Sequence, residues 1–158
     1  MMISRVVSGG QTGVDRAALD AALELGLPCG GWCPKGRLAE DGAIDARYPL
    51  KDAPSEDYAQ RTEWNIRDSD GTLVLNRGPL AGGTAQTVEI AARLQKPHLM
   101  VDLERPLACE IIHAWLRANR IGVLNVAGPR ESKAPGISAQ AHQFLRALFS
   151  GAHPPQTR

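Results

Sequence analysis

Short apolar runs alternate along the chain with segments whose apolar residues recur at the spacing of a helix. The runs at 3–8, 27–32, 71–75, 98–101 and 121–126 show little polar alternation and predict five strands. Helices are predicted at 14–25, 55–67, 106–119 and 137–149, and a fifth follows Thr84 and ends near Gln95. Buried strands separated by helices are typical of a parallel sheet. We expect an α/β fold: a three-layer, Rossmann-like open sheet of five parallel strands with helices on both faces.

The segment 33–55 has no clean period and is interrupted by prolines and glycines. Loops of this length inside a domain are uncommon and are usually functional or disordered. Because 158 residues suit one domain of ordinary size, we expect a single domain over 1–150 and a flexible tail over 151–158.

Composition and charge argue against several classes of partner and site. The net charge is +1 without runs of like charge, which argues against nucleic acid and membrane surfaces as partners. The first residues contain no long apolar segment typical of a signal peptide. Three cysteines are too few for a disulfide scaffold, and neither they nor the four scattered histidines have zinc-site spacing. We expect a cytoplasmic protein without a metal held by its own side chains.

Three glycine-bearing loops follow the first, third and fifth predicted strands: 9–13, 78–84 and 127–132. In a parallel sheet all three lie at the carboxyl edge, where open α/β folds bind ligands. Glycines there let backbone N–H groups approach an anion at a helix N-terminus. The alternative for the first loop is a capping box formed by Thr12 and Asp15, and Thr84 has the same two interpretations. The spacing fits neither standard nucleotide-binding fingerprint.

Further candidates lie outside these loops. Tyr58, Arg61, Thr62 and Asn65 recur at helical spacing and form a polar face that continues from the long loop. The complete set of predicted ligand- or phosphate-binding residues is Gly9, Gly10, Gln11, Thr12, Gly13, Asp15, Arg16, Lys35, Gly36, Arg61, Asn65, Gly82, Gly83, Thr84, Gly128, Arg130 and Ser132.

The segments SGGQTGVDRAALDAALELG, WCPKGRLAEDG, YPL, RTEWNIRDSDGTLVL, GGTAQT and LNVAGPRES resemble the molybdenum carrier protein family over nearly the whole chain, from Ile3 to about Phe149. That family resembles molybdenum-cofactor carriers within the SLOG superfamily, a Rossmann-like group that also holds the lysine decarboxylase-like phosphoribohydrolases. The resemblance implies a carrier that binds molybdopterin or the molybdenum cofactor through its phosphate. The metal would then be held by the sulfurs of the pterin.

One departure from the enzymes of the superfamily is informative. Phosphoribohydrolases that resemble this fold carry P-G-G-x-G-T-x-x-E, whereas this chain has Thr87 at the position of the glutamate, and Glu89 falls on another side of the helix. The sequence therefore favours a binding protein over an enzyme. A nucleotide-binding enzyme that uses Glu40, Asp41 or Asp68 instead, or a nucleotide sensor, stays open. We also expect a homodimer or homotetramer.

Overall fold

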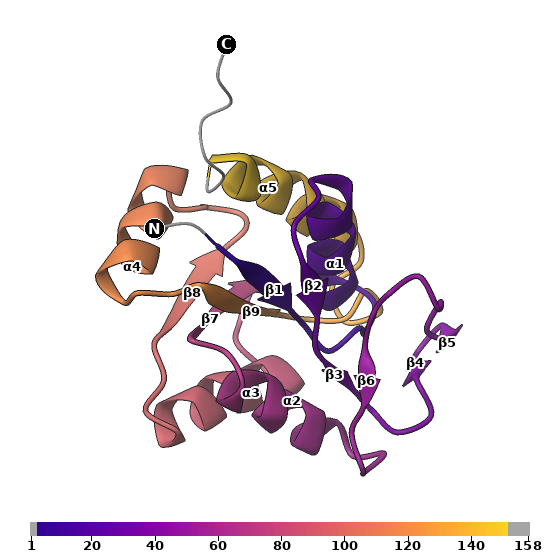
Figure 1. Ribbon diagram of the computed structural model, residues 1–158. Helices are drawn as coiled ribbons and strands as arrows, with labels where there is room; N and C mark the ends of the chain where they lie inside the picture. The colour runs from indigo at the N-terminus through magenta and orange to yellow at the C-terminus, as the bar shows by residue number, and fades with distance from the viewer. Residues whose placement is uncertain (1–2, 152–158) are drawn as a thin grey trace.

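The central sheet contains five parallel strands, as predicted (Figure 1). In the computed structural model, which describes residues 3–151, these strands are β1 (Arg5–Val7), β2 (Cys29–Gly30), β7 (Gly71–Asn76), β8 (His98–Asp102) and β9 (Val123–Ala127). Their order is β2-β1-β9-β7-β8, and each neighbouring pair is parallel. From β1 the chain crosses to β2 at one edge of the sheet, and from β7 it crosses to β8 at the other edge. The last strand, β9, lies between β1 and β7, which brings the three glycine-bearing loops side by side.

Helices cover both faces of this sheet (Figure 1). Helices α1 (Val14–Glu24), α4 (Cys109–Ala118) and α5 (Ile137–Gly151) lie on one face, and α2 (Tyr58–Arg67) and α3 (Gly82–Arg93) lie on the other. The main core fills the space under α1, α4 and α5, where Leu124, Leu145 and Phe149 are fully buried. Apolar burial on this scale is the main stabilising contribution to such a fold. The structure thus has the predicted three layers.

The predicted strand over 27–32 is interrupted at Gly31. This glycine has φ 126°, and a Cβ there would collide with the Ser8 carbonyl oxygen. The chain continues as β3 (Trp32–Cys33), which pairs with β6 (Lys51–Asp52) in a separate two-stranded sheet. A hairpin of β4 (Leu38–Ala39) and β5 (Gly42–Ala43) follows β3. The segment predicted as a loop over 33–55 therefore contains short strands, and it forms a small core with α1: Leu19, Cys33, Ile44, Tyr48 and Leu50.

Two helix starts show how local chemistry positions the elements. Asp57 caps α2 by accepting a hydrogen bond from the Ala59 N–H at 2.9 Å, as Asp at an N-cap commonly does. Helix α4 begins at Cys109, three residues after its predicted start at Pro106.

No helix within residues 3–151 is long and apolar enough to cross a membrane. The predicted tail lies outside the described residues except for Gly151, which ends α5.

Candidate functional site

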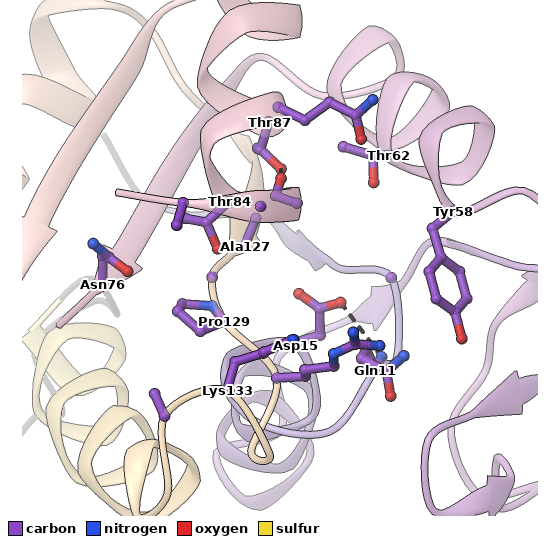
Figure 2. A pocket seen from close by; sticks show the side chains of 18 of the residues that line it. Gln11, Asp15, Tyr58, Thr62, Asn76, Thr84, Thr87, Ala127, Pro129 and Lys133 are labelled. Atoms are coloured by element: carbon purple, nitrogen blue, oxygen red, sulfur yellow. Dashed lines mark hydrogen bonds between the residues drawn. The ribbon is translucent and has the colours of Figure 1, made fainter. Parts of the chain in front are cut away.

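A cavity of about 540 Å³ opens at the carboxyl edge of the sheet (Figure 2). Its walls come from the loops after β1, β7 and β9 and from the polar face of α2. Figure 2 shows Tyr58 and Thr62 on the α2 side of this cavity, with Asn76 and Thr84 across from them. The lining residues are Gly9, Gln11, Asp15, Tyr58, Arg61, Thr62, Asn65, Asn76, Arg77, Pro79, Ala81, Gly82, Gly83, Thr84, Gln86, Thr87, Asn125, Val126, Ala127, Gly128, Pro129, Arg130, Lys133 and Ala134.

The N-terminus of α3 forms one wall of the cavity. Ala81 is the N-cap residue and supplies no side-chain hydrogen bond to the first turn. A Cβ on Gly82 or Gly83 would meet open space, so the first turn faces the cavity without a side chain over it. Thr84 lies inside the helix and is not its cap, contrary to one interpretation of the sequence. The first N–H groups of a helix lack helical partners and carry partial positive charge. This wall is therefore suited to an anion.

A buried ion pair forms the floor of the cavity. Arg61 Nη1 donates to Asp15 Oδ2 at 2.8 Å, and the two residues are 9% and 5% exposed. Burial raises the pKa of the Asp15 carboxyl above its ordinary value, while the charge and hydrogen bond of Arg61 oppose that rise. The Arg61 Nε atom is buried and has no hydrogen-bond partner in the described part of the chain. A buried donor without a partner is costly and therefore requires an explanation.

The cavity lining is cationic. Asp15 is its one carboxylate among the described residues, against four basic side chains: Arg61, Arg77, Arg130 and Lys133. The formal sum is therefore 4 − 1 = +3. Arg77 is directed toward the loop before α5, where its Nη2 donates to the Pro135 carbonyl at 2.8 Å. A concave surface with this balance attracts anions.

The glycines of the first loop are explained by contacts within the protein. A Cβ on Gly9 would overlap the Arg61 guanidinium, and one on Gly13 would collide with the Pro129 carbonyl oxygen. A Cβ on Gly10, whose φ is 79°, would collide with Leu50. Gly10 and Gly13 are not among the residues that line the cavity.

Several donors of the same loop are occupied. The Gln11 N–H donates to Asp15 Oδ2 at 3.3 Å, and the Val14 N–H donates to the Pro129 carbonyl at 3.2 Å. Helix α1 has Gly13 as its N-cap and no side-chain cap, so the capping box interpretation of Thr12 and Asp15 is wrong. This loop therefore holds Arg61, Leu50 and the β9 loop in close contact.

At the rim of the cavity, Glu40 accepts hydrogen bonds from the hydroxyls of Thr12 and Ser132 and, at 3.1 Å, from the Ser132 N–H. Arg130 Nε lies 3.6 Å from the same carboxylate. The two hydroxyl bonds hold the pKa of Glu40 below its ordinary value. Next to it, Asp41 pairs with Arg16 at 2.8 Å, and this lowers the pKa of Asp41.

Comparisons with known proteins identify the family of this chain. The family model described as the "Circularly permutated YpsA SLOG family" matches residues 6–149. This chain belongs to that SLOG family. It is also similar to a crystal structure at 1.45 Å of a "putative molybdenum carrier protein" from Syntrophus aciditrophicus SB, with 46% identity. The match covers 94% of this chain and 95% of that one, with a TM-score of 0.89. No curated protein matches the chain. The resemblance found in the motifs is thereby confirmed.

In this SLOG family member, ten of the seventeen predicted site residues line the cavity and seven do not. Five of those seven lie in the loops after β1 and β9 or in the first turn of α1: Gly10, Thr12, Gly13, Arg16 and Ser132. Lys35 and Gly36 lie in the segment 33–55, where their N–H groups donate to the Ser55 carbonyl and to the Asp52 side chain, respectively. Among residues 3–151, no group of three or more His, Cys, Asp or Glu side chains gathers as a metal site.

Some lining residues were not among the predicted set. Asn76 ends β7, Asn125 lies within β9, and Lys133 follows the β9 loop. A polar side chain inside or at the end of an apolar strand is the signal that could have identified the two asparagines, because buried polar groups require partners. Lys133 carries no such signal, since lysines next to turns are common on any surface.

Proposed function

We propose that this protein binds a phosphate-bearing heterocycle in the cavity, with the phosphate at the N-terminus of α3. The observation that carries the proposal is the uncapped first turn at Gly82 and Gly83, which faces the cavity with no side chain over it. Phosphate groups bind at helix N-termini because the N–H groups and the helix dipole both favour negative charge. Arg61, Arg130 and Lys133 supply cations in the same cavity.

The remaining lining suits a polar ring system. The α2 wall carries Tyr58 and Thr62, and strands β7 and β9 contribute the amide side chains of Asn76 and Asn125. Each of these amides also donates one hydrogen bond within the protein, to the Gly78 carbonyl and to Thr72 Oγ1 respectively. A heterocycle edge that alternates donors and acceptors pairs well with amides and hydroxyls, because each of those groups can match it. The volume of about 540 Å³ is in the usual range for a small-molecule site.

We infer that this ligand is the molybdenum cofactor. The support is the name of the structural neighbour, which calls that protein a molybdenum carrier, together with 46% identity over nearly the whole of both chains. A molybdopterin has a phosphate at one end and a pterin ring at the other, as the proposed site requires. The molybdenum is cargo in this proposal and is held by the sulfur atoms of the pterin.

A nucleotide-processing enzyme is the second candidate, and Asp15 is the observation that favours it. Its carboxyl lines the cavity and has a raised pKa, as a general acid often does. The other carboxylates suggested by the sequence are engaged elsewhere: Glu40 at the rim, Asp41 with Arg16, and Asp68 with Arg67 and Trp32. Because Asp15 is paired with Arg61, we infer that it positions that guanidinium.

The decisive experiment identifies the ligand that co-purifies with the protein. We expect protein from a host that makes the molybdenum cofactor to release a fluorescent pterin on denaturation and oxidation, at a stoichiometry that approaches one per chain. Protein from a host without molybdopterin synthesis should carry neither that pterin nor stoichiometric molybdenum or zinc. A co-purifying nucleotide, or release of a base from added nucleoside monophosphates, would support the second candidate instead.

A further inference from the structure

The carboxylate of Glu40 occupies a set of anion donors at the rim of the cavity. Two hydroxyls and one N–H donate to it, from Thr12 and Ser132, and the Glu131 N–H in turn donates to Thr12 Oγ1 at 3.1 Å. A phosphate oxygen accepts hydrogen bonds from the same kinds of donor. Glu40 is therefore placed as an anionic ligand would be.

Glu40 stands at the tip of the β4–β5 hairpin, which pairs only with itself in the described sheets. Figure 1 shows this hairpin to the side of the central sheet, beyond β6. The Arg37 guanidinium fixes its base by donating to the carbonyls of Leu50, Ile44, Asp45 and Tyr48. The contacts of Glu40 and Asp41 with the rest of the protein are polar, and they include the Glu40 N–H, which donates to Gln11 Oε1 at 2.8 Å. Ala39, next to them in β4, packs against the small core that contains Leu50.

Arg130 connects this tip to the cavity. It lines the cavity and lies 3.6 Å from Glu40, a separation that brings Coulomb attraction without a hydrogen bond. An anion in the cavity and the Glu40 carboxylate therefore compete for one guanidinium. A dianionic phosphate is the stronger competitor because it carries more charge and more acceptor oxygens.

We propose that Glu40 is a built-in competitor of the ligand: it holds Thr12, Arg130 and Ser132 while the cavity is empty, and an anionic ligand that draws Arg130 inward removes one of the contacts that hold the tip of the β4–β5 hairpin. This inference rests on the proposed function, because it requires a phosphate group in the cavity. It adds a conformational consequence to binding, which is a hairpin that is fastened in the empty protein and loosened in the loaded one.

The test compares Glu40→Gln with Asp41→Asn. The two changes remove the same charge from adjacent residues of one hairpin tip, but the partner of Asp41 is Arg16, which does not line the cavity. Calorimetric titration with guanosine 5′-monophosphate, a phosphate joined to a fused ring, should show binding to Glu40→Gln at least about threefold tighter than to wild type. Asp41→Asn should bind like wild type, which would exclude a general effect of charge.

Hydrogen exchange on wild type provides a second measurement that needs no variant. The amides of residues 38–43 should exchange faster when guanosine 5′-monophosphate or inorganic phosphate is bound than when it is absent. Slower exchange on binding, or a Glu40→Gln variant that binds no tighter than Asp41→Asn, would overturn the inference and leave the proposed function standing. Absence of binding of both guanosine 5′-monophosphate and inorganic phosphate to every form of the protein would also overturn the inference, whereas the proposed function is decided by the pterin that co-purifies.

Discussion

A carboxylate placed at the first turn of α3 should separate ligand binding from stability. Gly83 is the second residue of this helix, it has no positive φ, and a Cβ there would meet open space. In Gly83→Asp, the loss of a helical glycine favours the folded state by about 0.3 kcal/mol, because Asp is a better helix former than Gly but a poorer one than Ala. A negative charge near a helix N-terminus adds about 0.3–1 kcal/mol. We therefore expect the variant to be more stable than wild type by on the order of 1 kcal/mol.

The same carboxylate would occupy the position that we assign to the ligand phosphate. Loss of one hydrogen bond to a charged group lowers the free energy of binding by about 1.5–3 kcal/mol, which corresponds to a roughly 10- to 150-fold larger dissociation constant. Repulsion between the two anions adds to that loss. Gly83→Asn is the matched control, because it has nearly the same size and shape without the charge, and it should retain much more of the binding.

Urea unfolding measures the stability of the three proteins, and calorimetric titration with guanosine 5′-monophosphate measures their binding. If Gly83→Asp binds as tightly as wild type, the phosphate does not lie at the N-terminus of α3. A strongly destabilised Gly83→Asp would also count against this assignment, because the first turn of α3 could then not be open to the cavity.

Four further outcomes are expected. Arg61→Met should lower the free energy of unfolding by about 3–5 kcal/mol, because it leaves Asp15 buried without its partner. Burial already raises the pKa of Asp15 and the variant removes the opposing charge, so the loss of stability should shrink as the pH falls and the carboxyl is protonated. Thermal unfolding at several pH values would detect this change. Gly10→Ala should cost about 1–3 kcal/mol through strain at positive φ and the collision with Leu50, while titration shows unchanged binding. Asp57→Ala should lose about 1 kcal/mol of stability with the α2 cap, again without a change in affinity. Light scattering at micromolar concentration should report a homodimer or homotetramer, and a strict monomer would remove that expectation.

The sheet and its functional edge could be predicted because both depend on local patterns. Continuous apolar runs such as 71–75 and 121–126 form the central strands β7 and β9, and the glycine-bearing loops follow from where those runs end. The polar face of α2 was visible for the same reason, since Tyr58, Arg61, Thr62 and Asn65 repeat at helical spacing and all reach the cavity.

Contacts between residues far apart in the sequence could not be predicted in this way. Asp15 and Arg61 are separated by 46 positions, and nothing in the local pattern of either residue indicates that they form a buried pair. The Glu40 contacts with Thr12 and Ser132 span 28 and 92 positions. The break at Gly31 likewise depends on the distant Ser8 carbonyl and the Asn65 side chain. Each of these features is set by how elements pack, after their local structure is determined.

The glycines illustrate why composition alone is ambiguous about a site. The motif SGGQTG and the motif GGT both place glycines after a strand and before a helix, so the sequence suggests the same role for both. The space around each missing side chain distinguishes them. Protein atoms fill that space at Gly9, Gly10 and Gly13, whereas it is open at Gly82 and Gly83. Glycines of the first kind permit close packing, and only the second kind leave room for a ligand against the backbone. On this argument the first loop positions Arg61 and the β9 loop, and the anion should lie at α3.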